Sequence, residues 1–189
     1  MPEFPSLTGR LLVAMPGIGD ARFEHAVILI CAHTPDHAMG LRLDRPAPGV
    51  DLRDVLAKLD APAPEDSRHR AVLIGGPVER ERGLVLHTDD WVSDDATIAI
   101  ADGLAMTGTR EVLAVMTDRI AGPGRSVLVL GYAGWGEGQL DEELSENAWL
   151  IAEADMDLIF DEDHEGKWNR VLAKLGVDAS FLSTQAGRA

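Results

Sequence analysis

Residues 126–144 read SVLVLGYAGWGEGQLDEEL, an apolar run followed by a glycine-rich loop and an acidic, helix-like segment. The loop contains Gly131, Gly134, Gly136 and Gly138. A strand, a glycine loop and a helix in this order outline a phosphate-binding motif. The first question is therefore whether the loop holds a nucleotide or is a turn that requires glycine.

Both common phosphate-binding motifs fail here at chemically important positions. A dinucleotide motif starting at Gly134 has Gln139 in place of its third glycine, and a P-loop starting at Gly131 has Glu137 in place of its lysine. The start of the following helix is also rich in carboxylates, which would repel a phosphate: Glu137, Asp141, Glu142 and Glu143. We therefore expect the glycines to provide positive φ angles or close packing against Trp135.

Length and composition indicate one domain over residues 1–189, with 46% hydrophobic and 26% charged residues, as in soluble globular proteins. The single cysteine, Cys31, excludes an intramolecular disulfide. The first residues lack a basic region and a signal-peptide core, and no apolar stretch approaches the ~18 residues of a membrane span. We expect a cytoplasmic protein without membrane contact.

The charge argues against direct binding to nucleic acid. Seventeen Lys and Arg residues oppose 32 Asp and Glu residues, a net charge of −15. Such a surface repels phosphates, because sequence-independent affinity for DNA depends on cationic neutralisation. The densest basic stretches, 68–70 and 80–82, are short.

Hydrophobic periodicity predicts more strands than helices. Predicted strands cover residues 11–15, 26–32, 39–46, 71–78, 83–88, 96–100, 126–133 and 148–154. Predicted helices cover 51–59, capped by Asp51, then 109–121, 139–147 and 167–176, the last ended by Gly176. We expect Pro46 to end the third strand, residues 79–82 to form a turn, and 61–70 to be an irregular loop. The pattern favours a mixed α/β domain over a doubly wound parallel sheet.

No catalytic or metal-binding constellation emerges from the chemistry-bearing residues. The carboxylates at 141–146 and 161–166 lack the spacing of di-iron or calcium sites, so no metal or cofactor is predicted. Cys31 lies in an apolar strand and is interpreted as a buried, inert thiol. His87 ends a strand, where it is either a general base or a hydrogen-bonded structural residue.

Several stretches, taken in order, resemble the YqgE/AlgH family of bacterial proteins: AMPGIGDARFEHAVILIC, HAMGLRLDRP, IGGPVERERGLVLH and LGYAGWGEGQLDEELSENAWL. The resemblance covers nearly the whole chain. It departs at His37, where the family pattern has glycine, and at Asp44, where it has asparagine. It implies an α+β fold with a bifurcated, mostly antiparallel sheet that forms a pseudo-barrel with flanking helices. It brings no catalytic residues, but one member is named as a regulator of alginate synthesis.

Two functional hypotheses follow. The first is a non-enzymatic cytosolic interaction or regulatory protein that acts through an unknown protein partner. The alternative is a small-molecule binder or enzyme, with a pocket formed by the Gly75–Val78 turn, His87 and the Tyr132–Gln139 loop. The candidate ligand- or partner-binding residues of both are Gly75, Gly76, Pro77, His87, Tyr132, Gly134, Trp135 and Gln139. The oligomeric state is not predicted.

Overall fold

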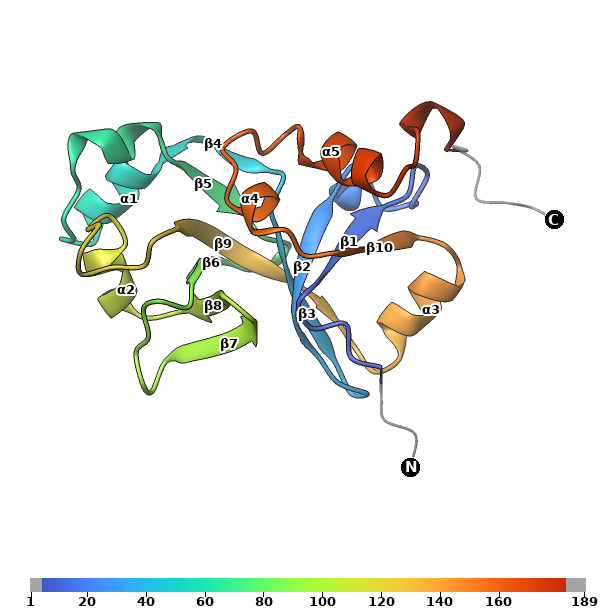
Figure 1. Ribbon diagram of the computed structural model, residues 1–189, viewed down its shortest axis with the longest axis horizontal. Coiled ribbons are helices and arrows are strands. Elements are labelled where there is room, and N and C mark those ends of the chain that lie inside the picture. The colour runs from blue at the N-terminus through green and yellow to red at the C-terminus, as the bar shows by residue number, and fades with distance from the viewer. Residues whose placement is uncertain (1–4, 183–189) are drawn as a thin grey trace.

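Strand β9 (Ser126–Trp135) is the branch point of a ten-stranded sheet in the computed structural model, which describes residues 5–182 (Figure 1). The other strands are β1 (Arg10–Ala14), β2 (Val27–His33), β3 (Ala38–Arg42), β4 (Pro46–Asp51), β5 (Ala71–Ile74), β6 (Val78–Thr88), β7 (Thr97–Ala101), β8 (Leu104–Thr107) and β10 (Trp149–Glu153). The helices are α1 (Leu52–Lys58), α2 (Arg110–Val115), α3 (Gln139–Ser145), α4 (Met156–Ile159) and α5 (Lys167–Lys174), with short 3-10 helices η1 (Ala21–Phe23), η2 (Glu65–His69) and η3 (Ala179–Phe181).

The sheet forks because β9 changes partner along one of its edges. Val129 of β9 pairs with Leu84 of β6 on one side and with Leu73 of β5 on the other. Four residues later, Ala133 pairs with Gly40 of β3 on the edge that β5 has left. The main path runs β10-β1-β2-β3-β9-β6-β8-β7, and β4 and β5 form the side branch. Among the described strands only the β5–β9 pair is parallel, so the prediction of a bifurcated, mostly antiparallel sheet is confirmed.

Gly131 lies where β9 passes from β5 to β3. Its φ of 71° lies in the left-handed region, which disfavours other residues within a strand. A Cβ atom at this position would lie 2.8 Å from the carbonyl oxygen of Val78 and 2.9 Å from that of Gly76. The glycine therefore allows both the bend of the strand and the close approach of the neighbouring backbone.

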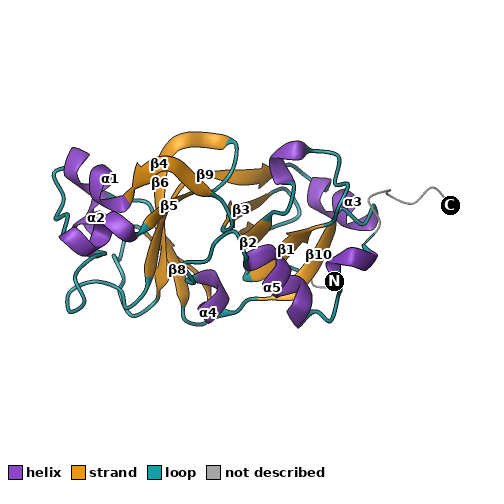
Figure 2. Ribbon diagram, turned by 90° about the horizontal axis from the view of Figure 1, so that it is seen from above, coloured by secondary structure: helices purple, strands orange, loops and turns teal. Residues whose placement is uncertain are grey.

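Helices cover the curled sheet on several sides and bury three apolar clusters (Figures 1 and 2). Helices α1 and α2 pack on the β5–β6–β9 region through Leu52, Leu56 and Val112. Helix α3 packs through Leu140 at the other end of β9. The largest cluster lies on the opposite face from α1 and α2 and includes residues of α4 and α5. The sheet curls into a half-barrel that is open on one side (Figure 2).

Most predicted elements and caps are present. The side chain of Asp51 accepts a hydrogen bond from the amide of Asp54 and caps α1. Gly176, with φ 69°, ends α5 in a Schellman motif, in which the amides of Gly176 and Val177 donate to Ala173 and Leu172. The segment 148–154, which could have extended a helix, forms strand β10 as expected.

Two expectations about strand limits are wrong, and one strand was not predicted. Pro46 begins strand β4 instead of ending β3, and β4 lies at the margin of the side branch, where the missing N–H costs nothing. Residues 79–82 continue β6 with exposed side chains and an irregular register, so the turn falls earlier, at 75–77. Strand β8 was not predicted, because a four-residue run is too short for a periodicity signal.

Two further segments differ from expectation. The helix predicted at 109–121 ends at Val115, and the carboxylate of Asp118 accepts hydrogen bonds from the amides of Ile120 and Ala121 to form a turn. The segment 61–70 contains η2, whose Ser67 is fully buried. The hydroxyl of Ser67 donates a hydrogen bond to the carbonyl oxygen of Pro64, so this part of the segment is a regular 3-10 turn and not an irregular loop.

Candidate functional site

The structure distributes the eight candidate residues over four separate places. Trp135 and Gln139 lie at the α3 corner, and Gly75, Gly76 and Pro77 lie at the fork of the sheet. His87 pairs with Ser126 at the start of β9, whereas Trp135 ends that strand nine residues later, roughly 30 Å away at strand rise. The expectation that these segments line one pocket is therefore not met.

At the α3 corner, the carboxylate of Glu143 organises the glycine–tryptophan loop. It accepts hydrogen bonds from Trp135 Nε1 at 2.9 Å, Trp149 Nε1 at 2.8 Å and Gln139 Nε2 at 2.9 Å. The two indoles are buried and meet edge to face, with ring centroids 6.2 Å apart. The amide of Gly136 also donates to Gln139 Oε1, so the loop is closed by its own side chains.

The glycines of this loop have different roles. Gly138, with φ 67°, precedes the first turn of α3 in the left-handed conformation. A Cβ atom on Gly134 would lie 3.8 Å from the ring of Tyr132, and one on Gly136 would meet no residue beyond its two chain neighbours within 4 Å. With carboxylates along its first turn and an internally bonded loop, the start of α3 is unlike a phosphate cradle, in agreement with the failed sequence motifs.

At the fork, two glycines allow neighbouring backbones to touch. A Cβ atom on Gly75 would lie 2.3 Å from the carbonyl oxygen of Gly131. A Cβ atom on Gly76 would lie 2.1 Å from the carbonyl carbon of Tyr132. Gly75 also accepts a hydrogen bond from the amide of Arg42, which ties β3 to the turn that follows β5. These glycines are required by packing, and Gly76 and Pro77 additionally face a cavity.

His87 is fully buried in a hydrogen-bonded row of side chains. Its Nδ1 lies 2.8 Å from the carbonyl oxygen of Thr88, and its Nε2 lies 2.8 Å from Thr107 Oγ1. Because a carbonyl only accepts, Nδ1 carries a proton. Thr107 contacts Thr97 Oγ1 at 2.7 Å, and Thr97 accepts from the amide of Ser93. Both ring nitrogens therefore have hydrogen-bond partners within the fold, as expected if His87 is a structural residue and not a general base.

Tyr132 lines a groove of about 550 Å³ within the open side of the half-barrel. The groove runs between the β2–β3 hairpin and the arm formed by β6, β8 and β7. Its apolar lining includes Met39, Leu84, Ile98 and Met106. Glu79, beside Tyr132, raises the pKa of the tyrosine phenol. Of the eight candidates, only Tyr132 lines this groove.

A second cavity, of about 300 Å³, lies at the fork of the sheet. It is lined by four arginines and no carboxylate, together with apolar side chains from η1, β4, β5 and β9. The arginines are Arg22, Arg42, Arg45 and Arg80. Sequence reasoning did not find this site, because its arginines are scattered over about 60 residues and form no motif.

Arg42 is held rigidly in this cavity by a buried ion pair. Its Nε and Nη2 donate to Asp44 at 2.9 and 2.8 Å, and both side chains are less than a tenth exposed. Asp44 also accepts from the amide of Val27, while Arg42 donates to the carbonyl oxygens of Arg22 and Glu24. Asp44, the departure from the family's asparagine, is thus the charged partner of Arg42. His37, the other departure, is exposed and contacts Thr34.

Lys167 is a buried lysine whose three N–H groups all have acceptors. Nζ donates to the carbonyl oxygens of Leu43 and Ile159 at 3.2 and 2.9 Å and to His164 Nδ1 at 2.9 Å. Burial lowers the pKa of Lys167 to about 8. Burial and the adjacent ammonium lower the pKa of His164 to about 4. The cluster joins α5 to β3, and its hydrogen-bonding capacity is used within the fold.

A third cavity, of about 930 Å³, is a wide cleft of mixed charge between the start of β9 and α4. Arg125 at its rim pairs with Asp157 at 2.8 Å. Arg70 donates to the carbonyl oxygens of Met116 and Ser126. Arg125 and Asp157 neutralise each other, and the cleft carries both signs of charge, so size alone does not make it the best binding site.

Other chemistry-bearing groups are also internal to the fold. Cys31 is buried, and desolvation raises the pKa of its thiol to about 12. Within residues 5–182, no three or more His, Cys, Asp or Glu side chains are grouped so that they could hold a metal ion. In the same range, no helix has the length and apolar character needed to cross a membrane.

Comparison with known proteins gives consistent matches over nearly the whole chain. A sequence model of the AlgH-like family matches residues 11–180. A "UPF0301 protein" of Caulobacter vibrioides is 55% identical over 183 residues, which cover 97% of this chain and 94% of the relative. A "UPF0301 protein" of Ruegeria pomeroyi is 46% identical over 184 residues, which cover 97% and 99% of the two chains.

Solved structures match in the same way. The solution structure of the AlgH protein from Pseudomonas aeruginosa has a TM-score of 0.78 and 39% identity, with 100% of both chains covered. A crystal structure of a Corynebacterium diphtheriae protein has a TM-score of 0.72 at 23% identity, covering 98% and 95% of the two chains, and supports the fold alone. The sequence matches and the structural match agree, and the chain belongs to the AlgH-like family.

Proposed function

We propose that the chain is a non-enzymatic cytosolic interaction protein that binds an extended segment of a protein partner beside strand β7. The observation that carries this proposal is a free sheet edge next to an apolar groove. Within the described part of the chain, β7 pairs only with β8, and Ile98 of β7 is 55% exposed. Natural proteins usually protect such edges with charge, proline or cover.

The free part of the edge is short but unprotected. Gly9 packs against Ala101, and the β7–β8 register shifts between Ala99 and Ala101, which leaves 97–99 as the accessible segment. None of these three residues is charged. An added strand would gain backbone hydrogen bonds at the edge, and its alternate side chains would enter the groove beside Ile98 and Met106.

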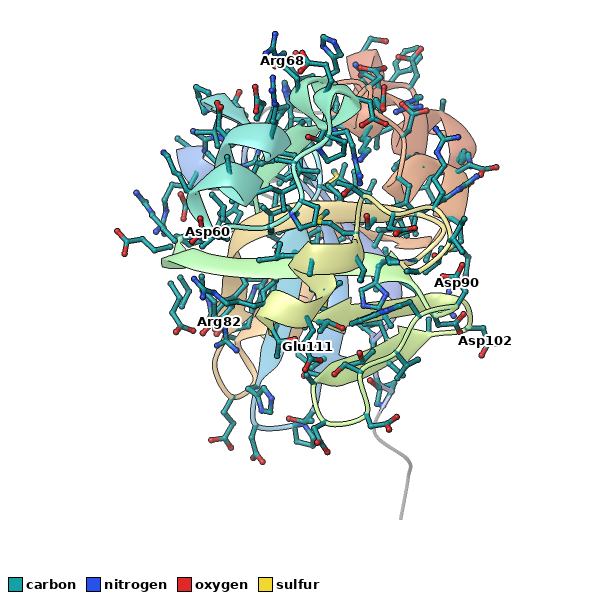
Figure 3. All side chains as sticks on the ribbon, turned by 90° about the vertical axis from the view of Figure 1, so that its left-hand side faces the viewer. Asp60, Arg68, Arg82, Asp90, Asp102 and Glu111 are labelled. Carbon is teal, nitrogen blue, oxygen red and sulfur yellow. The ribbon has the colours of Figure 1, made fainter. Side chains whose placement is uncertain are left out.

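Charge indicates the chemistry of the partner. Asp94 and Asp95 precede β7, and Asp102 follows it. The carboxylates of Asp90, Asp102 and Glu111 lie on the same side of the molecule (Figure 3). If a second copy of this chain paired antiparallel at this edge, carboxylates of the two copies would lie opposite each other and repel. These carboxylates would instead attract a partner segment rich in Lys and Arg. A regulatory role would then be exerted through this partner and not by direct contact with DNA.

The surroundings of the candidate catalytic groups support the non-enzymatic part of the proposal. His87 has both ring nitrogens engaged, and Lys167 has all three N–H groups engaged, in each case away from the cavities described above. A general base must be within reach of a substrate proton. Neither group is exposed to a substrate.

The test is capture of partners by the purified protein, followed by direct binding to the captured protein. Ile98→Lys introduces a charge into the groove and onto the edge. Its matched control is Ile120→Lys, because Ile120 is 96% exposed and lies in a turn outside the groove. We expect Ile98→Lys to weaken direct binding about tenfold or more, or ~1.4 kcal/mol, and Ile120→Lys to leave it unchanged. Equal effects of the two variants, or a partner indifferent to Ile98→Lys, would overturn the proposal.

A further inference from the structure

The 300 Å³ cavity at the fork of the sheet has a charge opposite to that of the molecule around it. Acidic residues outnumber basic ones by 32 to 17, yet the cavity is lined by four arginines and no Asp or Glu. The charge of the cavity lining is therefore opposite in sign to the net charge of the chain. An arrangement of this kind attracts anions, because clefts lined by one sign of charge concentrate the opposite one.

The four arginines differ in how far their charge is already neutralised. Arg42 is paired with Asp44, and Arg22 is paired with Asp20 at 2.7 Å. Arg45 and Arg80 are exposed and make no side-chain hydrogen bond or ion pair with any residue from 5 to 182. The cavity thus has two neutralised arginines, of which Arg42 is buried, and two guanidinium groups whose donors are available. A guanidinium presents its N–H groups in a fork that matches carboxylate and phosphate oxygens.

The rest of the lining is apolar. Phe23, Ile74, Pro77 and Leu130 contribute to it, with further apolar residues from β4. Among the described residues, no hydroxyl, amide or carboxylate side chain lines the cavity, so no side chain there would accept a hydrogen bond from a sugar hydroxyl. The volume is at the lower end of the range for small-molecule sites, and such sites combine an apolar lining with a few polar groups that fix orientation.

The cavity follows from the fork itself. Ile74 pairs with Leu130 at the end of the β5–β9 ladder, and the next residue, Gly75, accepts from the amide of Arg42 on β3. The cavity lies at this junction, and Gly76 and Pro77 of the turn that follows β5 form part of its lining. The site is therefore built by the backbone and not by a mobile loop alone.

We propose that this cavity binds a small organic anion with an apolar body, whose carboxylate or phosphate group is held by Arg45 and Arg80. The apolar body lies against Phe23, Ile74 and Leu130. This inference is independent of partner binding at β7, since the two sites share no lining residue.

The test is a titration of purified protein followed by NMR amide shifts, with four probes: benzoate, phenyl phosphate, benzyl alcohol and inorganic phosphate. We expect benzoate or phenyl phosphate to shift the amides of Phe23, Gly76 and Leu130 saturably. The double variant Arg45→Gln/Arg80→Gln should weaken this binding about tenfold or more. The matched control is Arg119→Gln, because Arg119 is also exposed and free of a side-chain partner within the described chain, but lies outside this cavity.

Each other outcome would overturn the proposal. Benzyl alcohol binding as tightly as benzoate would show that the charge is irrelevant. Inorganic phosphate binding as tightly as phenyl phosphate would show that the apolar lining is irrelevant. An equal loss in Arg119→Gln would indicate a general effect of net charge, and the absence of saturable shifts up to about 10 mM would exclude a specific site. The amide spectrum of the double variant shows directly whether it is folded, and the single variants Arg45→Gln and Arg80→Gln keep the proposal testable if it is not.

Discussion

The turn at Gly75–Pro77 faces a cavity, whereas the loop from Gly134 to Gly138 is closed by the side chains that follow it. In the turn, the glycines let three backbones meet, and the polar groups of nearby Arg45 and Arg80 have no side-chain partner in residues 5–182. In the loop, Glu143 takes the hydrogen bonds of both neighbouring indoles. The proposed binding site is thus distinguished by unused hydrogen-bonding groups, and the number of glycines does not reveal it.

The largest expected effect comes from comparing two arginines of the same cavity. Arg42→Ala should lower the free energy of unfolding by about 3–5 kcal/mol, because it leaves Asp44 buried without its partner. Arg45→Ala should change the free energy of unfolding by less than about 0.5 kcal/mol, because Arg45 is exposed. Urea denaturation of both variants measures the difference. Similar losses for the two would mean that Arg45 has a structural role.

The second test contrasts one glycine from each segment. Gly76→Ala should cost about 3 kcal/mol of unfolding free energy, because the added methyl group would overlap the backbone of Tyr132. Gly136→Ala should cost less than about 1 kcal/mol, because nothing lies within 4 Å of the added atom and its φ is not positive. Thermal unfolding followed by circular dichroism gives both values. The comparison fails if Gly136→Ala is the more damaging change.

The third test examines the closed loop alone. Glu143→Ala should cost about 2–3 kcal/mol, because two buried indole N–H groups lose their acceptor. Glu143→Gln retains one acceptor oxygen and should cost less. Glu142→Ala, on the exposed face of the same helix, is the control and should be nearly neutral. Tryptophan fluorescence in denaturant reports both stability and local structure, and a neutral Glu143→Ala would disprove the role of the carboxylate.

The smallest expected effect concerns a third fully bonded cluster, that of Lys167 and His164. The folded-state pKa of His164, about 4, lies below its unfolded value, so the unfolded state binds the proton first. Stability from this group is complete above about pH 6.5 and is lost as the pH falls towards 4, by on the order of 2 kcal/mol. Asp161 and Asp163 oppose the shift and limit its size.

This pH dependence can be separated from that of the carboxylates. The carboxylates with lowered pKa, such as Asp161 and Asp178, lose their contribution only below their ordinary value of 3.8. His164→Asn retains an acceptor for Lys167 but does not titrate. The variant should therefore remove the slope of stability between pH 6.5 and 4, as measured by denaturation at several pH values. An unchanged slope would assign the dependence to other groups.

Much of the fold could be predicted because its signals are local. Apolar alternation located most strands, and Asp51 and Gly176 marked two helix ends through their own backbone preferences. The errors at Pro46 and residues 79–82 occurred where a segment at the margin of the sheet tolerates a residue type that a central strand would not. Trp135, Trp149 and Trp168 are buried, as is usual for large aromatic side chains.

The candidate site was less predictable because its residues are brought together over long distances. His87 and Trp135 lie at opposite ends of one strand ladder, which neither motif nor spacing indicates. Arg22, Arg45 and Arg80 come from three separate segments and meet only at the fork. No local pattern distinguishes them from arginines on an ordinary surface.

By itself, the sequence determined the strand-rich α+β character, the acidic charge and the family, since these depend on composition, periodicity and ordered motifs. Only the tertiary structure decided that β9 pairs first with β5 and then with β3 along the same edge. It also decided that Glu143 closes the glycine loop and that an arginine-lined cavity opens at the fork. The physical reason is that hydrogen bonds and charges act between neighbours in space. The identity of those neighbours is settled only when distant strands pair.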